Sequence, residues 1–72
     1  MIRRESFINK IRGIGYSYKD QRPRIQLWRK GMHFIPVPRR DLLTEEFVTS
    51  SLRQAGVDAE EIESFLRSTR SS

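Results

Sequence analysis

The 72-residue chain contains no cysteine, and this absence limits how the protein can be stabilised. No disulfide can reinforce the fold, and no cysteine-containing zinc site can form. A domain of this length buries only about 60% of the surface that its unfolded chain exposes, so its core is thin. We therefore expect one domain that folds by packing alone or with help from a partner. The lack of cysteine also fits a reducing, cytoplasmic location.

Long apolar runs and histidines are scarce as well. No stretch approaches the roughly 18 apolar residues of a membrane span, and Met1–Glu5 lacks the apolar run of a signal peptide, so we expect no membrane partner. With His33 as the single histidine, no nucleophile triad can be assembled. Gly13-Ile14-Gly15 lacks the rest of any phosphate-loop motif. We expect no cofactor and no metal.

Charge is what the chain has in abundance, and it is unevenly distributed. Residues 1–40 carry eleven Lys or Arg against two acidic residues, an excess of +9. Residues 41–72 carry three Arg against seven acidic residues, which is −4. Charges often do no more than solvate a surface, but an excess of this size favours a surface that meets a polyanion, with RNA as the expected partner.

The first forty residues predict a helix followed by three strands. Apolar residues from Phe7 to Ile14 recur at helical spacing, in a helix that begins at Ser6 or one turn earlier, and Gly15 suits a left-handed cap after it. Three alternating segments follow, at 16–18, 24–29 and 32–37, with a turn at Lys30-Gly31 between the last two. Prolines 36 and 38 predict that the third strand lies at an edge.

The middle strand has two distinct faces. Ile25 and Leu27 point one way, while Arg24, Gln26 and Trp28 point the other way. If the two aliphatic residues face the core, the second set lies on the free face of the sheet.

The acidic half predicts two helices. Thr44 is a good N-cap, Gly56 ends the first helix, and Asp58 opens the second with a capping box. Residues 68–72 have no apolar anchor, so we expect a frayed tail after a single domain at 1–67. The fold class is α+β: a helix, a three-stranded antiparallel sheet, then one or two helices.

Three short motifs in this order resemble the HicA-like (YcfA-like) family of toxins. They are Ile14-Gly15-Tyr16 after the first helix, Val37-Pro38-Arg39 at the end of the hairpin, and the passage from Ser51 to Val57. The resemblance implies a fold like the double-stranded-RNA-binding domain, cleavage of mRNA, and neutralisation by a HicB-like antitoxin.

One departure from the family affects its chemistry. The family's catalytic histidine follows a Gly-Ser pair before the second strand, where this chain has Arg22-Pro23-Arg24. Pairing the hairpin about Lys30-Gly31 puts His33 opposite Trp28, at the solvent-facing tip and roughly 13 Å from Arg24, too far to replace the missing group. The resemblance therefore assigns no catalytic residue, and whether the protein is an enzyme stays open.

Basic residues at the strand ends and loops are the candidate phosphate contacts, and aromatic residues are candidates for stacking on bases. The candidate phosphate contacts are Lys19, Arg22, Arg24, Arg29, Lys30, Arg39 and Arg40. The candidates for stacking are Trp28 and Tyr18, although Trp28 fits equally well as a cover for the core.

Two hypotheses about function follow. The first is an RNA-binding toxin, or a divergent relative with weak or lost ribonuclease activity. The alternative is a non-catalytic protein-interaction module that binds an acidic partner through the basic hairpin and the edge strand.

Overall fold

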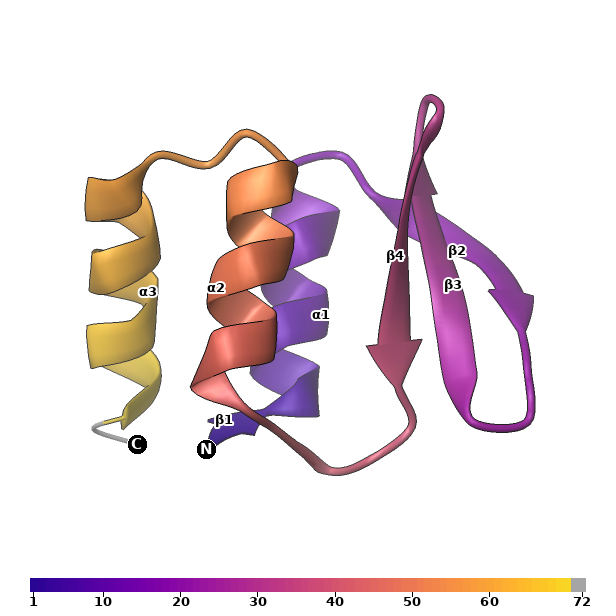
Figure 1. Ribbon diagram of the computed structural model, residues 1–72, viewed down its shortest axis with the longest axis horizontal. Helices are drawn as coiled ribbons and strands as arrows, with labels where there is room; N and C mark the ends of the chain where they lie inside the picture. The colour runs from indigo at the N-terminus through magenta and orange to yellow at the C-terminus, as the bar shows by residue number, and fades with distance from the viewer. Residues whose placement is uncertain (71–72) are drawn as a thin grey trace.

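The protein is an α+β globule in which helices cover one side of a small antiparallel sheet, as a computed structural model that describes residues 1–70 shows (Figure 1). The elements are, in order, β1 (Ile2–Arg3), α1 (Arg4–Gly13), β2 (Ser17–Gln21), β3 (Ile25–Lys30), β4 (His33–Pro38), β5 (Leu42–Leu43), α2 (Glu45–Gln54) and α3 (Ala59–Arg70). The predicted fold class is confirmed, with two helices after the sheet.

Helix α1 begins at Arg4, the earlier of the two predicted positions, and ends in a Schellman motif. The Tyr16 N–H donates to the Ile11 carbonyl at 2.9 Å, and the Gly15 N–H donates to the Arg12 carbonyl at 3.1 Å. Gly15 has φ +109°, a conformation that residues with a Cβ rarely adopt. The cap turns the chain directly into β2.

The three-stranded sheet has the order β2-β3-β4, so β4 is an edge strand as predicted. The hairpin register differs from the predicted one: Lys30 pairs with His33, and Trp28 pairs with Ile35. The two turn residues are Gly31 and Met32, one position later than expected. Gly31 has φ +61° at the first central position, where type II′ turns take glycine.

The prediction for the two faces of β3 was wrong. Trp28 is 3% exposed and belongs to the core with Ile35 and Val37. Leu27 and Ile25 are only half-buried and lie on the face away from the helices. Both faces of β3 carry apolar residues, so alternation alone did not decide between them. The neighbouring β4 decides, because its buried pair Ile35 and Val37 shares a face with Trp28.

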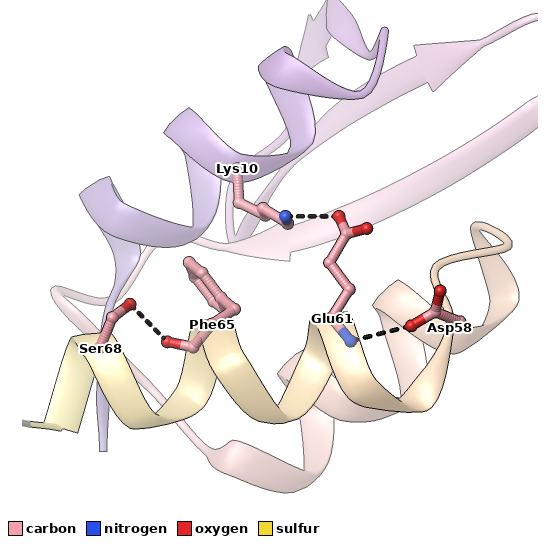
Figure 2. A network of polar contacts seen from close by, with 5 residues as sticks. All are labelled: Lys10, Asp58, Glu61, Phe65 and Ser68. Carbon is pink, nitrogen blue, oxygen red and sulfur yellow. Dashed lines mark hydrogen bonds and ion pairs between the residues drawn. The ribbon is translucent and has the colours of Figure 1, made fainter.

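Both predicted N-cap side chains in the acidic half are confirmed, whereas the return bond from the Glu61 side chain that completes a capping box at Asp58 is not found among the described residues. Thr44 Oγ1 accepts a hydrogen bond from the Phe47 N–H at 3.1 Å, and Asp58 Oδ1 accepts one from the Glu61 N–H at 2.8 Å. The Glu61 carboxylate also reaches across to Lys10 of α1 at 2.7 Å, which ties α3 to α1 (Figure 2).

The frayed tail was expected from residue 68, but α3 continues to Arg70. The hydroxyl of Ser68 donates to the Phe65 carbonyl at 3.0 Å, as Figure 2 shows. Thr69 Oγ1 donates to the carbonyls of Phe65 and Leu66, each at 3.1 Å. Residues 71 and 72 of the expected tail lie outside the described residues.

A two-stranded ladder between β1 and β5 was not predicted, because two-residue strands are too short to show alternation. Ile2 pairs with Leu43, and both side chains are buried. The Arg4 N–H donates to the Asp41 carbonyl at 2.8 Å. This ladder fixes the segment between β4 and α2 against the start of α1.

Candidate nucleic-acid interface

The structure separates the seven predicted basic contact residues into distinct places. Arg22 and Arg24 lie at the β2–β3 connection, and Arg39 and Arg40 follow β4. Figure 1 shows that these two connections lie at the same end of the molecule as the start of α2, whereas the β3–β4 tip lies at the opposite end. We call Arg22, Arg24, Arg39 and Arg40 the arginine end.

Of the remaining predicted residues, Arg29 and Lys30 lie at the hairpin tip. Lys19 lies on the outer strand β2, where the pairing with β3 is irregular between Tyr18 and Asp20. The pair at the hairpin tip lies at the opposite end of the sheet from the arginine end.

Hydrogen bonds to main-chain groups hold the arginine end together. The Arg39 N–H donates to the Arg24 carbonyl at 3.1 Å, which extends the β3–β4 pairing by one residue. Its side-chain Nη1 donates to the carbonyls of Pro23 and Arg22 at 3.2 and 3.4 Å. These bonds use one nitrogen of the guanidinium, so the other N–H groups of Arg39 stay available to an anion.

Asp41 directly follows Arg40 in the chain, and Asp20 lies beside Arg22. Asp20 Oδ2 accepts a hydrogen bond from Arg22 Nε at 2.9 Å, and both side chains are exposed, so the pair contributes at most about 1 kcal/mol. No acidic side chain among residues 1–70 forms an ion pair with Arg24, Arg39 or Arg40. The end therefore keeps a local positive charge.

A pocket of about 570 Å³ opens between the arginine end and the start of α2. Arg24, Arg39 and Arg40 line it together with the N-cap residue Thr44. Its apolar wall includes Leu43 and Phe47, as well as prolines 23 and 38. No carboxylate lines it, since Glu45 and Glu46 border a separate hollow. The sequence gave no sign of this pocket, because three segments far apart in the chain form it.

Trp28 is not available for stacking on a base, which corrects its place among the candidate RNA contacts and leaves its alternative role as a cover for the core. Its ring is buried beneath the guanidinium of Arg12, which lies 5.3 Å from the ring centroid. Tyr18 packs edge-on against it at 6.0 Å and is 51% exposed. Tyr18 is therefore the aromatic residue on β2 that a base can reach.

The open face of the sheet is largely apolar, which the sequence reading missed when it assigned the faces the wrong way round. Leu27 pairs with Pro36 on this face, and Arg29 pairs with Phe34, which is 44% exposed. Successive N–H groups of an edge strand point alternately toward its neighbour and away from it. Since the Arg39 N–H points toward β3, residues 36 and 38 are positions whose N–H would point away from the sheet, and both are prolines. Proline has no N–H, so this edge is a poor template for another strand.

His33 is half-buried and pairs with Lys30, not with Trp28. Its Nδ1 lies 2.6 Å from the hydroxyl of buried Tyr16, and the two rings meet edge-on. Because His33 begins β4 at the hairpin tip, it lies at the opposite end of the sheet from Arg22-Pro23-Arg24.

Within residues 1–70, no group of three or more His, Cys, Asp or Glu side chains is placed to hold a metal ion. None of the helices in this part of the chain is both long and apolar enough to span a membrane.

Tyr16 predicts a loss of stability in alkaline solution. Burial raises the pKa of its hydroxyl above the ordinary value of 10.0, because the phenolate is poorly solvated inside the protein. The folded state then holds the proton more tightly than the unfolded state, so this contribution is complete below pH 10 and is lost as pH rises through the folded pKa. We expect the urea concentration at the midpoint of unfolding to decrease as the pH is raised above 10. In Tyr16→Phe this decrease should be smaller. An equal fall in the wild-type protein and in Tyr16→Phe would contradict the assignment.

Comparison of the chain with protein-family models, with curated proteins and with solved structures finds no match. The order α1-β2-β3-β4-α2 is consistent with the topology of the double-stranded-RNA-binding domain. Membership of the HicA-like family stays a prediction from the three sequence motifs.

Proposed function

We propose that the protein binds RNA through the phosphate backbone, with the arginine end as the main contact. The observation that carries this proposal is the convergence of Arg22, Arg24, Arg39 and Arg40 from two separate connections onto one end of the sheet. Three of the four form no ion pair with a described acidic residue, so binding a phosphate does not require an internal contact to break. Such contacts give affinity that depends little on base sequence.

Within this proposal, the protein is a HicA-like toxin or a relative that has lost cleavage. The place that corresponds to the family's histidine, Arg22-Pro23-Arg24, is part of the arginine end. Arginine stabilises negative charge on phosphate but is a poor proton acceptor, because its pKa exceeds about 12. We therefore propose binding without efficient cleavage.

Salt dependence tests the proposal. If three or four phosphates of single-stranded RNA are neutralised, the logarithm of the binding constant should fall with the logarithm of salt concentration at a slope of about −2 to −3. Fluorescence anisotropy with a labelled oligoribonucleotide in chelator gives this slope, and gel analysis of the same sample shows whether the RNA is cut.

Absence of binding at low salt, or affinity that does not change with salt, would reject the RNA proposal. Cleavage products that disappear with His33→Ala would reject the part of the proposal that concerns lost catalysis.

The apolar open face favours a second candidate function, a module that binds an acidic protein such as a HicB-like antitoxin. Leu27, Phe34 and Pro36 would supply the apolar contact, and Arg29 beside them would pair with the acidic rim of the partner. The prolines of β4 make this face a better docking surface than the edge of the strand. Under this alternative, a protein that does not bind RNA at low salt would still bind its partner.

A further inference from the structure

We infer that the pocket beside the arginine end binds the terminal nucleotide of an RNA strand, with a terminal phosphomonoester held by Arg24, Arg39 and Arg40. The inference rests on the proposed RNA binding and names the part of the RNA that this pocket takes.

The charge of the pocket favours a terminal phosphate over an internal one. Three arginines and no acidic residue are among the residues that line it. A phosphomonoester carries about −1.5 to −2 charges at pH 7, whereas each internal phosphodiester carries one. Because Coulomb attraction scales with the charge of the ligand, three converging arginines gain most from the terminal group.

The shape and chemistry of the rest of the pocket suit a nucleoside. A volume of about 570 Å³ falls within the range of small-ligand sites. Leu43 and Phe47, with Pro23 and Pro38, offer apolar surface on which a base or ribose can pack. A site for inorganic phosphate alone would not need this apolar wall.

Arg39 and the apolar wall of the pocket are held in place before a ligand binds, so among its arginines only Arg24 and Arg40 have to be ordered. Arg39 is fixed by the carbonyls of Arg22 and Pro23. Leu43 is buried in the β1–β5 ladder, and the ring of Phe47 packs edge-on against Phe7 with centroids 5.6 Å apart. Prearranged contacts of this kind lower the entropic cost of binding.

The test compares one short oligoribonucleotide with three kinds of end: a 5′-phosphate, a 3′-phosphate, or hydroxyls at both ends. At 0.1 M salt we expect one of the phosphorylated strands to bind roughly fivefold more tightly than the hydroxyl-ended strand, since one more charge is neutralised. Whichever strand gains affinity identifies the end that the pocket takes. Arg40→Ala, and independently Arg24→Ala, should abolish this preference.

Arg22→Ala is the matched control, because Arg22 belongs to the arginine end but does not line the pocket. It should weaken binding of all strands and keep their ratio. Equal affinity for the three strands would overturn the inference and leave RNA binding intact, whereas no binding to any strand would overturn the proposed function itself.

Competition with 5′-AMP, 3′-AMP and inorganic phosphate tests the apolar wall. One of the nucleotides should displace the phosphorylated strand at lower concentration than inorganic phosphate does. Equal displacement by inorganic phosphate would show that the pocket recognises the phosphate alone and would overturn the nucleotide assignment.

Discussion

Replacing Trp28 with alanine is expected to lower the free energy of unfolding by about 3–5 kcal/mol, which is the usual cost of truncating a large buried aromatic residue. Trp28 is 3% exposed and packs in one cluster with Ile35, Val37 and Tyr16. For 72 residues, a typical stability of 0.05–0.15 kcal/mol per residue amounts to about 4–11 kcal/mol. The loss is therefore a large fraction of the total stability, and the variant should unfold at a much lower urea concentration.

Urea unfolding followed by far-UV circular dichroism measures this loss, because the chain has one tryptophan and the variant has no indole fluorescence. Trp28→Phe is a milder companion. It removes an indole N–H that has no hydrogen-bond partner among the described residues, which offsets part of the packing that it loses.

Leu27→Ala is the matched control, because Leu27 is the neighbour of Trp28 on the opposite face of β3 and is half-buried. It should cost about 1 kcal/mol, since less apolar surface returns to water. The opposite ranking, with Leu27→Ala more damaging than Trp28→Ala, is what the sequence-based assignment of the faces implied. That ranking would contradict the orientation of the sheet described above.

Replacing Arg24 and Arg40 together with alanine is expected to weaken RNA binding by about 25-fold at 0.1 M salt. Each phosphate contact with a single strand contributes about 0.7 to the salt slope, so the loss of two lowers affinity by roughly 10 to the power 1.4 and makes the slope shallower by about 1.4. Both side chains are exposed and neither forms a hydrogen bond or ion pair within residues 1–70, so folding should be unaffected. Anisotropy titrations at several salt concentrations give both quantities.

The comparison variant is Arg29→Ala with Lys30→Ala, which removes the same net charge from the opposite end of the sheet. It should reduce affinity several-fold less than the Arg24 and Arg40 pair does, because only long-range attraction is lost. Equal losses from the two pairs would show that RNA lies along the whole sheet and would reject the arginine end as the main contact.

Local signals in the sequence predicted most of the secondary structure. Thr44, Asp58 and Gly15 each act through hydrogen bonds or backbone angles within one turn of the chain, and each cap is present in the structure. The prolines of β4 predicted an edge strand for an equally local reason, the missing N–H. The basic residues at the two connections were also predicted as contacts from their loop positions, although their gathering at one end was not.

Predictions that depended on distant partners were less successful. The hairpin register shifted by one turn position because Gly31, with φ +61°, takes the first central place of the turn and not the second. The two faces of β3 were exchanged because Ile25 and Leu27 are as apolar as a core requires, and only pairing with β4 shows which face is covered. The β1–β5 ladder left no periodic signal at all.

The sequence by itself determined the order of the three helices and of the strands of the main sheet, their caps and the separation of a basic half from an acidic half, because these depend on contacts within a few residues. Tertiary structure alone decided that Trp28 is a core residue and that the open face of the sheet is apolar. It also decided that Arg24, Arg39 and Arg40 share a pocket with Phe47. The physical reason is the same in each case: these properties arise when segments far apart in the chain bury one another's surfaces, and no local pattern records that choice.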